Sequence, residues 1–283
     1  MIRFALDNDL TQLKALWEEA FGDTPEDTDD YFTRRHQNDC MLVFVQEGDI
    51  AGMLSLLPVT LASQGREFPA RYIYGVATKQ TFRGQGISTR LMEYTHAFMK
   101  EQGEKAAILV PASPSLFDFY GKRGYKTIFS LDIAQKTAKE IFPSPMDGHA
   151  APCDTATYTQ IRDKAFFSSS LYVRWDERAV DYAVTSLSSP GGLLHLKAPG
   201  GEGCALWERQ ENEVLVRDLA LVNMDMHTAL SLLHTVLQAP LYTLRLMPGS
   251  FPGAVSRPFG MIRWLDAEPI LSGSPPYLSL ALD

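Results

Sequence analysis

A pair of glycines separated by one residue is the feature of this sequence with the clearest chemistry. It lies in the run Arg83-Gly-Gln-Gly-Ile-Ser88, after the apolar stretch Tyr72–Thr78 and at the start of an amphipathic stretch over 86–102. The pattern predicts a strand, a turn and a helix. Backbone N–H groups at a helix N-terminus point outward, and the helix dipole favours negative charge there. Glycine lets a ligand approach the backbone and accepts positive φ. We therefore expect a phosphate or pyrophosphate to bind at this turn.

Two other phosphate-binding motifs do not fit the turn. A Walker loop ends in Gly-Lys-Ser/Thr, and the sequence has no such ending. The dinucleotide fingerprint needs a third glycine where Thr89 stands. The turn instead resembles the Arg/Gln-x-x-Gly-x-Gly/Ala signature with which the GNAT superfamily of N-acetyltransferases holds the pyrophosphate of acetyl-CoA. Ser88 departs from that signature, but its small side chain and its N–H suit the same role.

A second motif of that family follows further along the chain. Ala106–Val110 predicts a short buried strand, and Ser115–Tyr125 predicts a short helix that ends at Gly121 or Gly124. Phe119-Tyr-Gly-Lys-Arg-Gly-Tyr125 is similar to the Phe/Tyr-Tyr-x-x-x-Gly-Tyr/Phe segment of GNAT enzymes. The two motifs stand in the family's order, and the resemblance in specific residues covers about 70–130.

The resemblance implies roles for particular residues. Backbone groups of the strand before the loop would pair with the cofactor arm, and the loop would bind the pyrophosphate mainly through its N–H groups. Tyr120 matches the family tyrosine that protonates the leaving thiolate, and a phenol stays protonated at neutral pH. Ser113 would cap the short helix or touch the cofactor arm, and the Arg83 side chain would meet a phosphate or remain a surface cation. The expected cofactor-binding residues are Val76, Ala77, Thr78, Arg83, Gly84, Gln85, Gly86, Ile87, Ser88 and Ser113.

The general base is left open by the sequence. The stretch Pro69–Gly75, where many GNAT enzymes carry a carboxylate, has none. The alternatives are Glu67, the helical residues His36, Asp29 and Asp30, the terminal carboxylate of Asp283 by analogy with the Eis-like group, or water alone. An acceptor pocket could be lined by the aromatic residues Trp17, Phe21, Tyr31 and Phe32, although core packing is the commoner fate of such side chains.

Composition narrows the classes of partner. Acids outnumber bases by 34 to 26 and the net charge is −8, which argues against nucleic acid and is compatible with a cationic amine. Cys40, Cys153 and Cys204 have no paired spacing, so we expect a reducing cytoplasm and no metal site. No stretch reads as a signal peptide or a membrane span. These features are compatible with a homo-oligomer.

The order of elements predicts one α+β domain of the GNAT fold, a mixed sheet flanked by helices, over 1–134. We expect a strand at Ile2–Ala5, helices at 9–21 and from Asp23 to about Gln37, and a hairpin of Met41–Gln46 with Ile50–Val59. The strand, loop, helix, strand, helix and strand of the two motifs complete the domain.

The rest of the chain predicts a degenerate copy of the same fold. A Pro- and Gly-containing linker over 135–153 leads to it. Helices at 155–167, 176–187 and 226–237 alternate with strands at 193–198, 204–209, 214–222 and 242–247, and 261–265 and 277–282 are expected to close this second sheet. Residues 221–228 have neither glycine nor arginine, so the domain 154–283 is expected to bind no CoA. In architecture alone the chain resembles the Eis-like (enhanced intracellular survival) tandem acetyltransferases without their sterol-carrier domain.

Together these features indicate an acetyl-CoA-dependent N-acetyltransferase that acts on a small-molecule or peptide amine by direct attack in a ternary complex. No serine-hydrolase elbow is present, so no covalent nucleophile is expected. The alternative is a non-catalytic acyl-CoA-binding or regulatory protein on the same fold.

Overall fold

The computed structural model describes residues 1–141, 147–187 and 190–281. Among these residues, thirteen strands form one hydrogen-bonded sheet in the order β1-β2-β3-β4-β5-β13-β6-β12-β11-β10-β9-β7, with β8 paired to β3 beside this path. The strands are β1 (Ile2–Phe4), β2 (Met41–Gln46), β3 (Asp49–Ser63), β4 (Arg66–Thr78), β5 (Ala106–Leu109), β6 (Lys126–Thr137), β7 (His149–Pro152), β8 (Tyr172–Arg174), β9 (Gly191–Ala198), β10 (Gly201–Gln210), β11 (Glu213–Val222), β12 (Leu241–Leu246) and β13 (Val255–Trp264). The α-helices are α1 (Leu10–Phe21), α2 (Pro25–Arg34), α3 (Ile87–Glu101), α4 (Pro114–Gly121), α5 (Thr155–Phe166), α6 (Glu177–Thr185) and α7 (Met226–Leu237).

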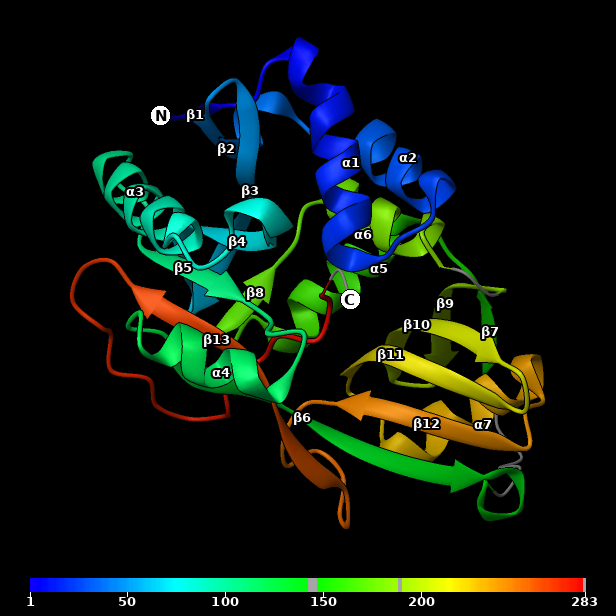
Figure 1. Cartoon of the computed structure of the whole chain (residues 1–283). Helices are drawn as coiled ribbons and strands as arrows, with labels where there is room; N and C mark the ends of the chain where they lie inside the picture. The colour runs from blue at the N-terminus through cyan, green and yellow to red at the C-terminus, as the bar shows by residue number, and fades with distance from the viewer. Residues whose placement is uncertain (142–146, 188–189, 282–283) are drawn as a thin grey trace.

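In the first half of the chain, helices cover both faces of a mixed sheet, as the sequence predicts. Helices α1 and α2 pack over one face around Leu13, Trp17 and Tyr31. Helices α3 and α4 pack over the other face around Leu91 and Tyr120. β3 and β4 are antiparallel, whereas β4 and β5 are parallel. The second half follows the same plan: α7 covers one face of β9–β12, and α5 and α6 cover the other (Figure 1).

The last strand joins the first half of the sheet and not the second, which corrects the expectation for 261–265. β13 lies between β5 and β6, where Met261 pairs with Leu109 and Val255 pairs with Ile133 (Figure 1). The expected strand at 277–282 is also wrong within the described residues. Tyr277 makes an isolated bridge with Tyr172, and the segment through Ala281 is otherwise irregular and buried.

The segment expected as a linker over 135–153 is partly sheet. β6 runs through Thr137 and pairs with both β13 and β12, and β7 pairs with β9. Residues 142–146 of this segment lie outside the described residues. Because β6 and β13 join the two halves into one sheet, the division into units at 1–134 and 154–283 remains a proposal about evolutionary origin and folding.

Candidate active site

A channel opens where β4 and β5 separate. The two strands pair only from Ala70–Tyr72 to Ala106–Ile108, and beyond this point they diverge. The resulting cavity has a volume of about 520 Å³ and lies between Tyr72–Val76 of β4, Leu109–Ala112 at the end of β5, and α4. Parallel strands that separate in this way leave backbone groups of β4 facing a cavity, where an extended ligand can bind to them.

Gly75 shapes the wall of this channel. Its φ is +60°, and a Cβ at this position would lie 2.6 Å from the Trp17 ring. The β3–β4 register also shifts between Met53 and Ser55, opposite this part of the strand. Only glycine accommodates both the positive φ and the close approach of the indole. Trp17 is thereby held directly against β4.

The glycine turn lies at the N-terminus of α3, as the sequence predicts. Gly84 and Gly86 have φ of +78° and +73°, and a Cβ on either would meet nothing within 4 Å. Gly86 is the N-cap of α3, and no side chain caps the helix. Residues 83–86 are exposed. The first N–H groups of α3 are therefore open to an external anion.

Tyr120 is placed by α4 on the wall of the channel. It is buried, and this burial raises the pKa of its hydroxyl to about 12. Its ring meets Phe119 and Tyr125 edge to face. Among the described residues its hydroxyl has no hydrogen-bond partner, so its proton is available to a group bound in the channel.

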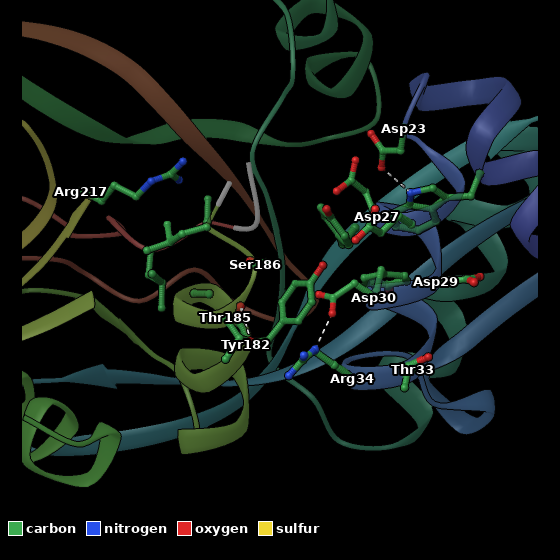
Figure 2. Close-up of a pocket in the computed structure, with 18 of the residues that line it drawn as sticks. Asp23, Asp27, Asp29, Asp30, Thr33, Arg34, Tyr182, Thr185, Ser186 and Arg217 are labelled. Carbon is green, nitrogen blue, oxygen red and sulfur yellow. Dashed lines mark hydrogen bonds and ion pairs between the residues drawn. The ribbon is translucent and has the colours of Figure 1, made fainter. Parts of the chain in front are cut away.

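A second cavity, of about 840 Å³, lies between the two halves of the chain. Figure 2 shows Asp27, Asp30 and Arg34 of α2 on one side, Tyr182 of α6 facing them, and Arg217 of β11 on the far side. Its carboxylates are Asp23, Glu26, Asp27, Asp29 and Asp30, and its basic side chains are Arg34 and Arg217.

The charges in this second cavity are only partly balanced. Asp30 pairs with Arg34, and Asp29 pairs with Lys14 at 2.6 Å. Within the part of the chain that the structure describes, Asp23, Glu26 and Asp27 form no ion pair. Aromatic side chains of Trp17, Tyr31, Tyr74 and Tyr182 line the same space. Carboxylates beside aromatic faces attract cations.

The two cavities meet at Trp17, Asp23 and Tyr74, which line both of them. Gly22 ends α1 in the left-handed conformation, and Thr24 takes the N-cap role of α2. Asp23 is therefore free of capping and accepts a hydrogen bond from Trp17 Nε1 at 2.7 Å (Figure 2). A carboxylate thus lies where the channel meets the second cavity, which is called the acidic cavity below.

The other expected cofactor residues lie on β4, at the α3 turn and at the start of α4. Val76 lines the channel, and Ala77 and Thr78 continue β4 in pairing with Met53 and Gly52. The Arg83 side chain donates to the Thr78 carbonyl at 3.2 Å. Ile87 is buried against the sheet, so only its backbone faces the turn, and Ser113 is the N-cap of α4, with its Oγ 3.1 Å from Ser115 Oγ.

The candidate bases are scattered. Glu67 pairs with Arg174 at the far end of β4, eight residues from Gly75, roughly 26 Å along a strand. His36 bonds Asn38 outside both cavities, and burial lowers the pKa of its ring. Asp29 and Asp30 line the acidic cavity. Asp283 lies outside the described residues.

Of the four expected aromatic residues, Trp17 and Tyr31 line the acidic cavity and Phe21 lines the channel, whereas Phe32 is buried in the core. Sequence reasoning missed Asp23, Tyr74, Tyr182 and Arg217. Asp23 had a local signal, since it directly follows a glycine at the end of a predicted helix. Tyr182 and Arg217 had none, because they reach the cavity from the other half of the chain.

Comparison with known proteins agrees with this geometry. Residues 1–128 match the model of the Acetyltransferase (GNAT) domain. A Streptococcus gordonii protein named NAD kinase is 30% identical over 122 residues, which are 41% of this chain and 44% of that protein, so this chain spans less than half of that relative.

Solved structures share the fold over most of the chain. A GCN5-related N-acetyltransferase from Anabaena variabilis has a TM-score of 0.78 at 18% identity and covers 94% of this chain and 73% of its own. A probable N-acyltransferase from Enterococcus faecalis has a TM-score of 0.77 at 15% identity, covering 94% and 72%. Eis1 from Mycobacterium abscessus has a TM-score of 0.71 at 16% identity, covering 94% and 74%.

Two kinds of feature are absent from the described residues. These residues contain no group of three or more His, Cys, Asp or Glu side chains that could hold a metal ion. They also contain no helix that is long and apolar enough to cross a membrane. The family match, the uncapped α3 turn and the channel beside Tyr120 together place residues 1–128 in the GNAT family of acetyltransferases.

Proposed function

We propose that this protein transfers an acetyl group from acetyl-CoA to a primary amine of a cationic acceptor, by direct attack in a ternary complex. The observation that carries the proposal is the junction at Trp17, Asp23 and Tyr74. There a channel suited to the cosubstrate meets a cavity suited to a cation.

The cosubstrate side uses the open N-terminus of α3. Backbone N–H groups of 84–88 would bind the pyrophosphate, and Arg83 lies beside them as a further donor. The pantetheine arm would enter between β4 and β5, where Val76 lines the channel. Because the Gly84 and Gly86 turn leaves open space, phosphates can approach the backbone closely.

The acceptor side uses the negative charge that the protein leaves unbalanced. Asp23, Glu26 and Asp27 would attract an ammonium group, and the aromatic wall would favour it further. Asp23 is held by Trp17 at the junction, so it would orient the ammonium toward the thioester. Water carries the ammonium proton away in this scheme, and no side chain is assigned as the base.

The transfer step itself needs a polarised thioester and a protonated leaving group. The neutral amine forms the new N–C bond at the carbonyl carbon as the C–S bond breaks. The thiolate takes a proton from Tyr120, the nitrogen releases its extra proton to water, and water returns a proton to the Tyr120 oxygen. The raised pKa of Tyr120, about 12, keeps its hydroxyl protonated at neutral pH.

The test is an acetylation assay with purified protein, acetyl-CoA and a panel of primary amines. Free CoA and acetylated amine should appear together, in equal amounts. Tight CoA binding without turnover would favour the non-catalytic acyl-CoA-binding alternative. Release of CoA without acetylated amine would indicate a thioesterase. A parallel incubation with ATP, Mg²⁺ and NAD tests the activity that names the streptococcal relative.

A further inference from the structure

The segment Tyr277–Ala281, here called the strap, is buried near the end of the described chain. All five residues are at most 5% exposed, whereas Ile270 shortly before them is 95% exposed. In Figure 1 the red strap returns from the exposed loop to the middle of the molecule. Leu280 and Ala281 line the acidic cavity, so the strap forms part of the wall of the proposed acceptor site.

A buried charged cluster holds the strap. Asp218 of β11 accepts hydrogen bonds from Tyr277 at 2.8 Å and from Ser279 on one oxygen, and from Arg162 at 2.7 Å and Tyr158 on the other. Arg162 of α5 also donates to Ser279 Oγ at 2.9 Å. Burial opposes ionisation of Asp218, but Arg162 and the hydroxyl donors outweigh it and keep its pKa below the ordinary value.

The cluster lies next to the cavity through a bulge in β11. Leu206 pairs with Asp218 and Trp207 with Val216, so Arg217 is the extra residue. A bulge redirects the side chains of its strand. Here Arg217 and Leu206 line the cavity while Asp218 enters the cluster, so the cluster and the cavity wall share one short stretch of backbone.

A buried ion pair is weak evidence for a gain in stability, because apolar residues of the same size often serve as well. Its best-attested use is to fix one arrangement of the chain. In this protein, the groups that satisfy the pair come from α5, β8, β11 and the strap, with Tyr172 of β8 accepting from Arg162 at 3.0 Å, so the pair fixes the strap relative to these elements.

We propose that Arg162, Asp218, Tyr277 and Ser279 are positioning residues for the acceptor site. They fix the strap so that Leu280 and Ala281 close the acidic cavity, and they thereby determine which amines it admits. This inference rests on the proposed function for its kinetic consequence, but the placement of the strap can be measured without turnover.

The test uses Tyr277→Phe and Ser279→Ala, which remove hydroxyl groups and keep Arg162 and Asp218 paired. The matched control is Tyr242→Phe. That tyrosine is also buried in the second half, and its hydroxyl bonds His234 and the Ala239 N–H, but it lines neither cavity. The measurements are hydrogen–deuterium exchange of 277–281 and steady-state kinetics with 1,4-diaminobutane and spermine.

In both strap variants we expect faster exchange over 277–281 and an acceptor KM raised about tenfold, with the KM for acetyl-CoA unchanged. The control should show neither effect. Faster exchange without a change in acceptor KM would overturn the proposal, and so would unchanged exchange in the strap variants. If the wild type acetylates neither amine, the proposed function fails for these acceptors. The strap is then judged from its exchange and from spermine affinity measured by calorimetry.

Discussion

Helices α3 and α7 occupy equivalent places in the two halves, yet their N-termini are capped differently. At α3 the N-cap is Gly86, with positive φ and no capping side chain. At α7 the N-cap is Asp225, whose carboxylate accepts from the Thr228 N–H at 2.9 Å and from the Thr228 hydroxyl at 2.7 Å. The second half supplies its own anion, while the first leaves the position open for one. The same backbone plan therefore serves as a candidate binding site in one half and as structure in the other.

The largest effect is expected from the buried tyrosines of the two halves. Tyr120 lines the channel, and its hydroxyl has no partner among the described residues, whereas the Tyr242 hydroxyl bonds two groups. Tyr120→Phe should lower the single-turnover rate about 10²–10⁴-fold with CoA affinity little changed, because the donor acts as charge builds on sulfur. Tyr242→Phe should keep the rate and lose about 1 kcal/mol of unfolding free energy.

The pH profile sharpens this prediction. Burial raises the pKa of Tyr120 to about 12, so the protonated donor is present at neutral pH and is lost only as pH approaches that value. No fall in single-turnover rate attributable to Tyr120 is expected between pH 7 and 10. If Tyr120→Phe keeps the full single-turnover rate on a good acceptor, Tyr120 is a packing residue.

The second prediction places at the N-cap of α3 the residue type that caps α7. Gly86→Asp should weaken CoA binding by about 100-fold or more, because the new carboxylate competes for the N–H groups and repels phosphates. Gly86→Ala is the control, since it carries at least as much strain at positive φ as Asp does but no charge. Calorimetry on the wild type should give one CoA site per chain. Equal affinity in the Asp and Ala variants would contradict the assignment of the turn.

The third prediction concerns the acidic cavity, where the halves face each other. Asp23→Asn keeps the shape and the Trp17 hydrogen bond but removes the charge, so the acceptor KM should rise about tenfold, with acetyl-CoA KM unchanged. Asp29→Asn is the control, because Asp29 is already paired with Lys14. The KM difference between the two variants should shrink at high salt, since screening weakens the attraction of the exposed charges. Equal KM values in both variants would remove Asp23 from acceptor binding.

Local sequence signals predicted the elements well and the pairing of distant elements poorly. The glycine turn, α3 and α7 are each predicted by features within a short window, namely the placement of glycines and the hydrophobic periodicity. The segment of β13 reads as a strand, but nothing in Val255–Trp264 says that its partners are β5 and β6. Strand propensity does not specify which strand a segment pairs with. The simplest assumption therefore placed this segment in the sheet of its own half.

The candidate site divides along the same line. Most of the proposed cosubstrate side is built from residues 72–120, and sequence motifs within this stretch predicted it. The proposed acceptor side combines Asp23, Tyr182 and Leu280, which come from the α1–α2 connection, α6 and the strap. The strap in particular reads as one more strand because it is apolar. Its hydroxyl groups donate to Asp218 of β11, a strand that also carries Glu213 and Arg217, and nothing in the sequence marks Asp218 as their partner.

The smallest effect is expected from removing the self-cap of α7. Asp225→Ala should lower the unfolding free energy by about 1 kcal/mol in chemical denaturation, and Asp225→Asn, which keeps an acceptor at the cap, should lose less.

Hydrogen bonds from Thr228 hold the pKa of Asp225 below its ordinary value of 3.8, so its contribution is present at neutral pH and fades as pH falls below that value. The gap between wild type and Asp225→Ala should therefore narrow in acid. Neither variant should gain a second CoA site, because Asn223 and Met224 precede the α7 N-cap where Gly84 and Gln85 precede the α3 N-cap, so the α7 turn lacks the glycines that let a phosphate approach the backbone. A second site in Asp225→Ala would mean that the carboxylate alone separates the two halves, and that the glycines of the α3 turn are not required.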